Sequence, residues 1–129
     1  MENATPIDHR FLHEMPNVRQ NEGEHFRRWF LSEECDLTVW FEGKMIVMFQ
    51  FSYDNNQQEK AVTWKIRQNL KHNLVSGNDH SPTKNEAAIL TNLSSVNKDY
   101  IIRKFQVQAK NIEFAIGDFI LNVLTDNKA

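Results

Sequence analysis

The clearest pattern along the chain lies between positions 36 and 66, where most of the aromatic and β-branched residues gather. Two apolar runs, 37–41 and 45–53, are separated by a short polar segment, and a third run, 61–66, follows turn-forming residues at 54–59. Apolar runs of this length separated by turn residues are typical of antiparallel strands. The pattern therefore predicts a three-stranded antiparallel meander.

The register of the first hairpin stays open between two connections. If Glu42-Gly43-Lys44 is the connection, Ile46 and Met48 lie on the face opposite an apolar set made of Leu37, Val39, Phe41, Met45, Val47, Phe49 and Phe51. A two-residue connection distributes the side chains differently. In both registers each face is largely apolar, whereas an antiparallel sheet with one wet face alternates cleanly. We therefore expect a sheet that is covered on both sides.

In the third run, Val62 and Trp64 alternate with Thr63 and Lys65. The face with Thr63 and Lys65 is more polar, so we expect an edge strand. The periodicity is then lost over positions 67–97, apart from a short extended piece at 70–75 and an apolar turn at 87–93. A patternless connection of this length is more often functional than ordinary. We expect any functional site to involve it.

Residues 1–23 are polar and contain prolines and a glycine that leave no room for a long helix, which predicts an irregular arm. In the next segment, 24–31, the residues Phe26, Trp29 and Phe30 recur at i, i+3 and i+4. This spacing predicts a short helix that lies over one face of the sheet or near its edge.

The last third of the chain carries apolar residues at intervals of three and four, which predicts helix: Ile101, Phe105, Ala109, Ile112, Ile116, Phe119, Ile120 and Val123. Asn97 is a suitable N-cap, and a break near Lys110 would let Asn111 cap a second helix. Gly117 costs about 1 kcal/mol relative to alanine inside a helix, which suggests that another backbone approaches closely there.

Together these elements predict an α+β fold, a three- or four-stranded antiparallel β-meander packed against the C-terminal helical segment. The 129 residues suffice for one hydrophobic core without disulfides or a structural metal. We assign an irregular arm to residues 1–23 and a single α+β domain to residues 24–129.

Charge and cysteine content narrow the function classes. The formal net charge is −2, the isoelectric point is near 6.2, and charges of both signs are interleaved, so we expect neither nucleic acid nor a membrane as partner. Cys35 is the only cysteine in the sequence, so no intrachain disulfide can form. The first residues lack a secretory pattern and no run of eighteen apolar residues occurs. We therefore expect a soluble, cytoplasmic protein.

The sequence contains no standard catalytic or cofactor-binding motif: G-x-S-x-G, G-x-G-x-x-G and a Walker-type Gly-Lys-Ser/Thr are all missing. Cys35 lacks the context of a catalytic nucleophile, and a small buried thiol is the favoured interpretation. His9 and His13 are four residues apart, but prolines flank them and no third ligand is identifiable. We predict no metal and no other cofactor.

One group of polar residues is a candidate ligand site. Gln50, Ser52 and Asp54 alternate along the middle strand, so they are expected to share a face that Trp64 of the next strand would wall. With closing residues from the following connection, the predicted lining is Gln50, Tyr53, Asp54, Trp64, His72 and Asn73. The simpler interpretation, which turn chemistry favours, is that Asp54 only opens a turn.

Five short stretches carry a resemblance through their residues and spacing: Arg27-Arg28-Trp29-Phe30, DLTVW at 36–40, FQFSYD at 49–54, AVTW at 61–64 and His72-Asn73. They resemble a group of small uncharacterised bacterial proteins whose pattern over about residues 27–75 is RRWF, DLxVW, GFQLxYDK, ALTW and HxxV. This chain has Met48 where that group has glycine and Asn55 where it has lysine. The group has no established activity, so the resemblance implies no catalytic residue.

Two functional hypotheses follow. The first is a non-enzymatic binding or interaction protein that uses an apolar sheet or helix surface together with the 67–97 connection. It would form an isologous homodimer, because one domain of this size has few elements with which to cover a two-faced apolar sheet. The second is a small-molecule binding protein or minor enzyme with a pocket between sheet and helix.

Overall fold

The computed structural model describes residues 7–68, 70–74 and 98–126. In these residues the chain forms one six-stranded antiparallel sheet, with its strands in chain order, and two helices. The predicted α+β fold, a meander packed against C-terminal helices, is confirmed, although the sheet has more strands than the three or four expected. The elements are β1 (His13–Glu14), β2 (Phe26–Leu31), β3 (Asp36–Glu42), β4 (Met45–Tyr53), β5 (Lys60–Lys65), β6 (Lys71–Leu74), α2 (Lys98–Gln108) and α3 (Phe114–Asp126).

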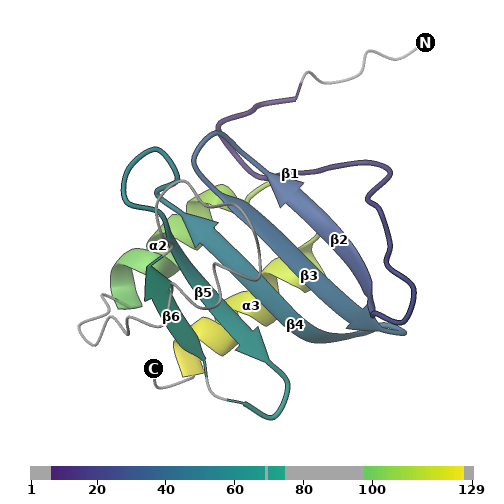
Figure 1. Cartoon of the computed structure of the whole chain (residues 1–129). Helices are drawn as coiled ribbons and strands as arrows, with labels where there is room; N and C mark the ends of the chain where they lie inside the picture. The colour runs from purple at the N-terminus through teal and green to yellow at the C-terminus, as the bar shows by residue number, and fades with distance from the viewer. Residues whose placement is uncertain (1–6, 69, 75–97, 127–129) are drawn as a thin grey trace.

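The described elements form two layers, with α2 and α3 both lying against the same face of the sheet (Figure 1). The core forms between them. Phe105 of α2 meets Phe51 of β4 edge to face, with ring centroids 5.2 Å apart. Trp64 of β5 lies between Phe49 of β4, at 5.8 Å, and Phe119 of α3, at 5.3 Å. Each large apolar side chain buried in this way contributes about 1.5–3 kcal/mol to folding.

The first hairpin combines a two-residue turn with a β-bulge. Glu42 pairs with Met45, so Gly43 and Lys44 form the turn, and Gly43 has the positive φ of 63° that such turns favour. Further along, Leu37 and Val39 pair with Phe51 and Phe49, so the expectation that these four residues share a face is confirmed.

The bulge corrects the rest of the predicted register. The pairing shifts between Trp40 and Phe41, where Trp40 pairs with Met48 but Phe41 pairs with Ile46. The unpaired residue reverses the alternation on β4 near the turn, so Ile46 joins the core, where Val47 had been expected. A bulge of this kind leaves no signal in a simple alternation of apolar residues.

The expected helix over residues 24–31 is wrong, because this segment contains β2. Its residues pair with β3 over the whole strand, from Phe26 opposite Phe41 to Leu31 opposite Asp36. The aromatic spacing fits both structures: in the strand Phe30 is buried on the helix side, and Trp29 lies on the opposite face. Pairing with β3 satisfies the backbone groups of β2 that face β3, whereas a two-turn helix on the surface would be marginally stable in water.

β5 is not an edge strand, because β6 pairs with it from Lys71 opposite Thr63 to Leu74 opposite Lys60. The short extended piece expected within residues 70–75 is therefore confirmed. The rest of the predicted patternless connection, positions 75–97, lies outside the described residues.

The predicted break in the C-terminal helical segment is confirmed. α2 ends at Gln108, and the backbone carbonyl of Glu113 accepts hydrogen bonds from the amides of Ile116 and Gly117 at the start of α3. Glu113 rather than Asn111 therefore precedes the second helix. Asn97, the expected N-cap of the first helix, lies outside the described residues. No helix in the described ranges is long and apolar enough to cross a membrane.

Arg28 joins three parts of the fold on the helix side of β2. Its guanidinium donates two hydrogen bonds to the carboxylate of Glu14 in β1, at 2.7 and 2.6 Å, and one of 3.2 Å to Glu113 before α3. It also lies over the rings of Phe30 and Phe41. A bidentate pair that is partly buried holds its geometry better than an exposed ion pair does.

The surroundings of Gly117 test the expectation that another backbone approaches the helix closely there. A Cβ built on this buried residue would meet no atom within 4 Å beyond its own helix and chain neighbours, so the expected close approach of another backbone is wrong. We predict that Gly117→Ala raises the free energy of unfolding by about 0.5–1 kcal/mol, because alanine loses less backbone entropy on folding. Urea denaturation of both proteins measures the change, and destabilisation would contradict this account.

Candidate functional site

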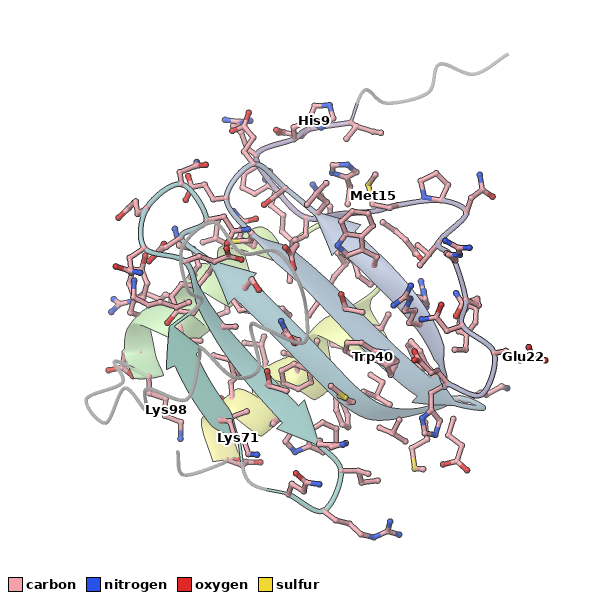
Figure 2. The ribbon with its side chains drawn as sticks, viewed as in Figure 1. His9, Met15, Glu22, Trp40, Lys71 and Lys98 are labelled. Carbon is pink, nitrogen blue, oxygen red and sulfur yellow. The ribbon has the colours of Figure 1, made fainter. Side chains whose placement is uncertain are left out.

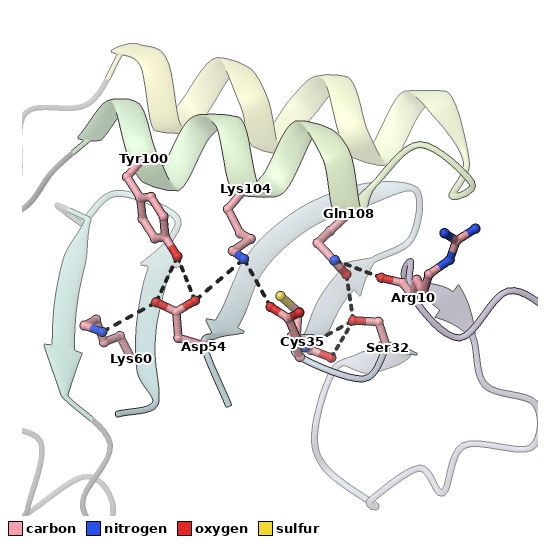
Figure 3. Close-up of polar contacts among 9 residues, drawn as sticks. Arg10, Ser32, Cys35, Asp54, Lys60, Tyr100, Lys104 and Gln108 are labelled. Carbon is pink, nitrogen blue, oxygen red and sulfur yellow. Dashed lines mark hydrogen bonds and ion pairs between the residues drawn. The ribbon is translucent and has the colours of Figure 1, made fainter. Parts of the chain in front are cut away.

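A row of buried and partly buried polar contacts, here called the polar seam, joins α2 to the strand ends at one end of the sheet (Figure 3). Its first half is centred on Asp54, which directly follows β4 and has a left-handed backbone with φ 56°. Aspartate tolerates this conformation better than most residues do. The change of direction brings the carboxylate to the side of the sheet where α2 lies, and its side chain is only 7% exposed.

The buried Asp54 carboxylate has three partners. The Tyr100 hydroxyl of α2 donates to its two oxygens at 2.8 and 3.0 Å. The ammonium groups of Lys60 and Lys104 lie 3.5 and 3.7 Å away, and Lys104 also contacts Glu34 at 3.2 Å. A buried carboxylate is tolerated only when its charge and lone pairs are compensated, as they are here.

These contacts fix the protonation of the groups around Asp54. Partial burial and the hydrogen bond to Asp54 raise the pKa of Tyr100, so its hydroxyl stays protonated and acts as a donor. Burial alone would lower the pKa of Lys104, but the hydrogen bond to Glu34 and the nearby negative charges raise it overall. Neither group is poised to accept a proton near neutral pH.

The second half of the polar seam ties the N-terminal arm to α2. The Ser32 hydroxyl donates to the side-chain oxygen of Gln108 at 2.6 Å, and the Gln108 amide donates to the backbone carbonyl of Arg10 at 2.9 Å. The backbone amide of Cys35 donates to the Ser32 oxygen at 3.1 Å. Burial raises the pKa of the Cys35 thiol to about 12, so it is not a thiolate nucleophile.

Sequence reasoning missed the α2 side of this seam, although a signal was present. Tyr100, Lys104 and Gln108 are spaced at i, i+4 and i+8, so they form one polar stripe along the helix. The stripe lies beside the apolar one that contains Ile101 and Phe105. A polar stripe that borders the buried side of a helix is a reasonable place to look for structural or functional polar contacts.

A groove of about 580 Å³ lies beside the polar seam. Arg103 and Lys104 of α2 line it together with Glu33 and Glu34 of the turn before β3, and Phe11 of the arm adds an aromatic ring. Its size suits a small ligand, and side chains of both charge signs lie among its lining residues.

The structure does not bring the predicted site residues together around one pocket. Gln50 lies on the sheet face away from the helices, opposite Thr38 and Thr63, whereas Tyr53 and Trp64 lie in or against the core on the helix side. The expectation that Asp54 shares a face with Gln50 is wrong, because the left-handed backbone turns Asp54 toward α2.

His72 and Asn73, the remaining predicted residues, belong to β6 rather than to a loop. Their backbones pair with Val62 and Ala61 of β5. The expectation that Trp64 walls the same surface as Gln50 is also wrong, since its ring lies between Phe49 and Phe119 under α3.

The face of the sheet opposite α2 and α3 is here called the helix-free face, because neither of the described helices lies on it. It carries three rows of side chains that run across the strands. The central row is Trp29, Thr38, Gln50, Thr63 and Lys71, and the row nearer the first hairpin turn is Arg27, Trp40, Met48 and Lys65. The third row, at the other end, is Leu31, Asp36, Ser52 and Ala61. Trp40 points away from the helices in Figure 2.

Burial on the helix-free face differs between its rows. In the third row Ser52 and Ala61 are buried, and burial raises the pKa of Asp36 to about 6, with a smaller contribution from the negative charge of Glu59. In the other two rows Trp29, Trp40 and Met48 are partly exposed. Trp29, Trp40 and Met48 therefore offer apolar surface that is accessible to a partner.

No metal-binding cluster of three or more histidine, cysteine or acidic residues occurs in the described ranges. No protein-family model matches the sequence, and no curated protein or solved structure is significantly similar to the chain. The resemblance to the group of small bacterial proteins therefore stays a prediction from the motifs.

Removing one donor to Asp54 tests the polar seam. We predict that Tyr100→Phe lowers the free energy of unfolding by about 1–2 kcal/mol, because the buried carboxylate loses a hydrogen bond while the ring stays in place. Arg103→Gln, on the same helix, is the matched control and should change stability by less than about 0.5 kcal/mol. Equal stabilities of the two variants in urea denaturation would show that the hydrogen bond contributes nothing.

The raised pKa of Asp36 leads us to predict that the stability of the fold depends on pH. Its pKa is about 6 in the folded protein and 3.8 when unperturbed, so between these values the folded state binds more protons than the unfolded state. The contribution of Asp36 to stability therefore falls as pH rises from about 4 to 6, and the penalty is complete above pH 6. Asp36→Asn should be about 1–3 kcal/mol more stable than the wild type at pH 7.5.

The two proteins should converge as the pH falls to about 4, where the carboxyl group of Asp36 is protonated in the folded state. Chemical denaturation at several pH values measures the difference, with Glu22→Gln as an exposed control. A difference between Asp36→Asn and the wild type that does not vary with pH would contradict the burial of the charge.

Proposed function

We propose that the protein is a non-enzymatic interaction protein that binds another protein chain through the helix-free face. The observation that carries the proposal is the group of Trp29, Trp40 and Met48, which lie in adjacent rows of that face and are partly exposed. Tryptophan and methionine are enriched in protein interfaces, and tryptophan often supplies a large part of the binding energy.

A second copy of the chain is the proposed partner. The tryptophans and Met48 lie on β2, β3 and β4, whereas Lys65 and Lys71 lie on β5 and β6. A two-fold axis through the tryptophans would bury the apolar part of both faces and leave the lysines at a solvated rim, the usual arrangement of a protein interface. The polar seam also offers no thiolate nucleophile, because burial keeps the Cys35 thiol protonated.

A bacterial origin and a cytoplasmic location are part of this proposal. The motif resemblance supports the first, and the single cysteine is compatible with the second.

A second candidate function, binding of a small molecule, is favoured only by the groove of about 580 Å³ beside the polar seam. Arg103 and Lys104 would give it a preference for an anionic group. A ligand for this groove would raise the melting temperature of the wild type but not of Arg103→Ala, while leaving the oligomeric state unchanged. This result would separate the second candidate from the first.

Sedimentation equilibrium over a wide concentration range tests the first candidate, and we predict a dimer for the wild type. Trp40→Glu should weaken dimerisation at least about tenfold, because two carboxylates would be buried where an apolar contact had been. Phe114→Ser is the control: this aromatic residue is 81% exposed, but it lies on α3, away from the helix-free face. A wild type that stays monomeric at every concentration would overturn the dimer.

A further inference from the structure

Among the described residues, the outer edge of β2 is only partly covered by another strand. β1 pairs with β2 at Phe30 and Leu31, and just beyond it the amide of Met15 donates to the carbonyl of Trp29 at 2.8 Å. The chain then leaves the edge. The unpaired groups of an edge strand are a template on which another strand can pair, so natural proteins cover or block them.

The side chain of Gln20 takes the place of a strand at the next position of this edge. Its amide nitrogen donates to the carbonyl of Arg27 at 2.8 Å, and the Arg27 amide donates to the Gln20 side-chain oxygen at 2.9 Å. A carboxamide has the same donor and acceptor as a peptide group, so this pair of bonds reproduces the exchange between two residues of an antiparallel ladder. Arg27 is two residues from Trp29, the spacing at which edge groups recur.

A second contact holds Gln20 in register. The Arg27 guanidinium donates to the backbone carbonyl of Arg19 at 3.0 Å, so the residue before Gln20 is tied to the same strand position. Between these bonds and β1 the arm does not pack closely on the strand: a hollow of about 460 Å³ lies there, lined by Met15, Val18 and Phe26 among others. The Gln20 bonds, rather than apolar packing, therefore close this part of the edge.

We infer that Gln20 is an edge guard: its carboxamide occupies a strand position on β2 and prevents copies of this chain from pairing edge to edge there. The inference does not depend on the proposed dimer, which uses the helix-free face rather than an edge. The species that the guard excludes is a second copy that adds its own extended chain to the Phe26–Trp29 edge. Phe26 is 55% exposed beside this edge and would gain apolar cover from such pairing.

The experiment compares Gln20→Ala with Gln20→Glu and with Gln57→Ala, an exposed glutamine in the turn before β5. We expect hydrogen exchange of the Arg27 amide to be about tenfold faster in Gln20→Ala than in the wild type. Gln20→Glu can still accept from the Arg27 amide but cannot donate to its carbonyl, so its exchange rate should lie between the two. Gln57→Ala should exchange like the wild type.

Sedimentation velocity at the same concentrations then tests whether the open edge associates. Gln20→Ala should form species larger than those of the wild type, whichever state the wild type adopts. Adding Arg27→Pro should abolish them, because that amide faces away from β3 and proline is tolerated at an outward-facing edge position. Unchanged exchange at Arg27 would overturn the inference, and so would faster exchange without larger species.

Discussion

The structure depends on burying one apolar face of a twisted antiparallel sheet under two helices. Phe51 and Phe49 lie at the centre of that face, and Phe105 and Trp64 pack against them, so a single layer of aromatic rings joins sheet and helices. This burial is the largest favourable contribution that the fold has, because the described chain contains no disulfide and no metal cluster. The positions of the remaining elements follow from it.

Polar contacts complete the structure where this apolar layer ends. At one end Asp54 and Gln108 join the strand ends, the turn before β3 and the N-terminal arm to α2, and the side chains of Asp54, Ser32 and Gln108 there all have partners. On the helix side of β2, Arg28 joins β1 to the residue before α3. These contacts add less free energy than the core does, but they set the positions of the arm and of the turns. The groove beside the seam and the hollow beside β2 both border such polar contacts.

The two faces of the sheet therefore have different roles, because only one of them packs against the helices. The helix side is occupied by the core, so it is not available for binding. The helix-free face is mixed: it is buried around Ser52 and partly exposed around Trp40. The proposed interaction surface lies on the exposed part, whereas the Gln20 guard acts on the strand edge. A sheet face binds a partner surface through its side chains, whereas a sheet edge binds another strand through its backbone groups.

The sequence by itself determined the α+β class, the three central strands, the break between the helices and the strand within 70–75, since each depends on local periodicity or on turn residues. Only the tertiary structure decided that 26–31 is a strand, because its aromatic spacing suits a helix equally well and pairing with β3 settles the choice. The candidate site was predicted less well. Regular alternation placed Asp54 on the same face as Gln50, but the left-handed backbone of Asp54 turns its side chain to the other face. The bulge in the first hairpin likewise moves residues of β4 from one face to the other. Neither feature changes the pattern of apolar residues in the sequence. Tyr100, which donates to Asp54, is 46 residues away from it, and Arg27, the partner of Gln20, is 7 residues away. Contacts between separate elements form only when packing brings those elements together.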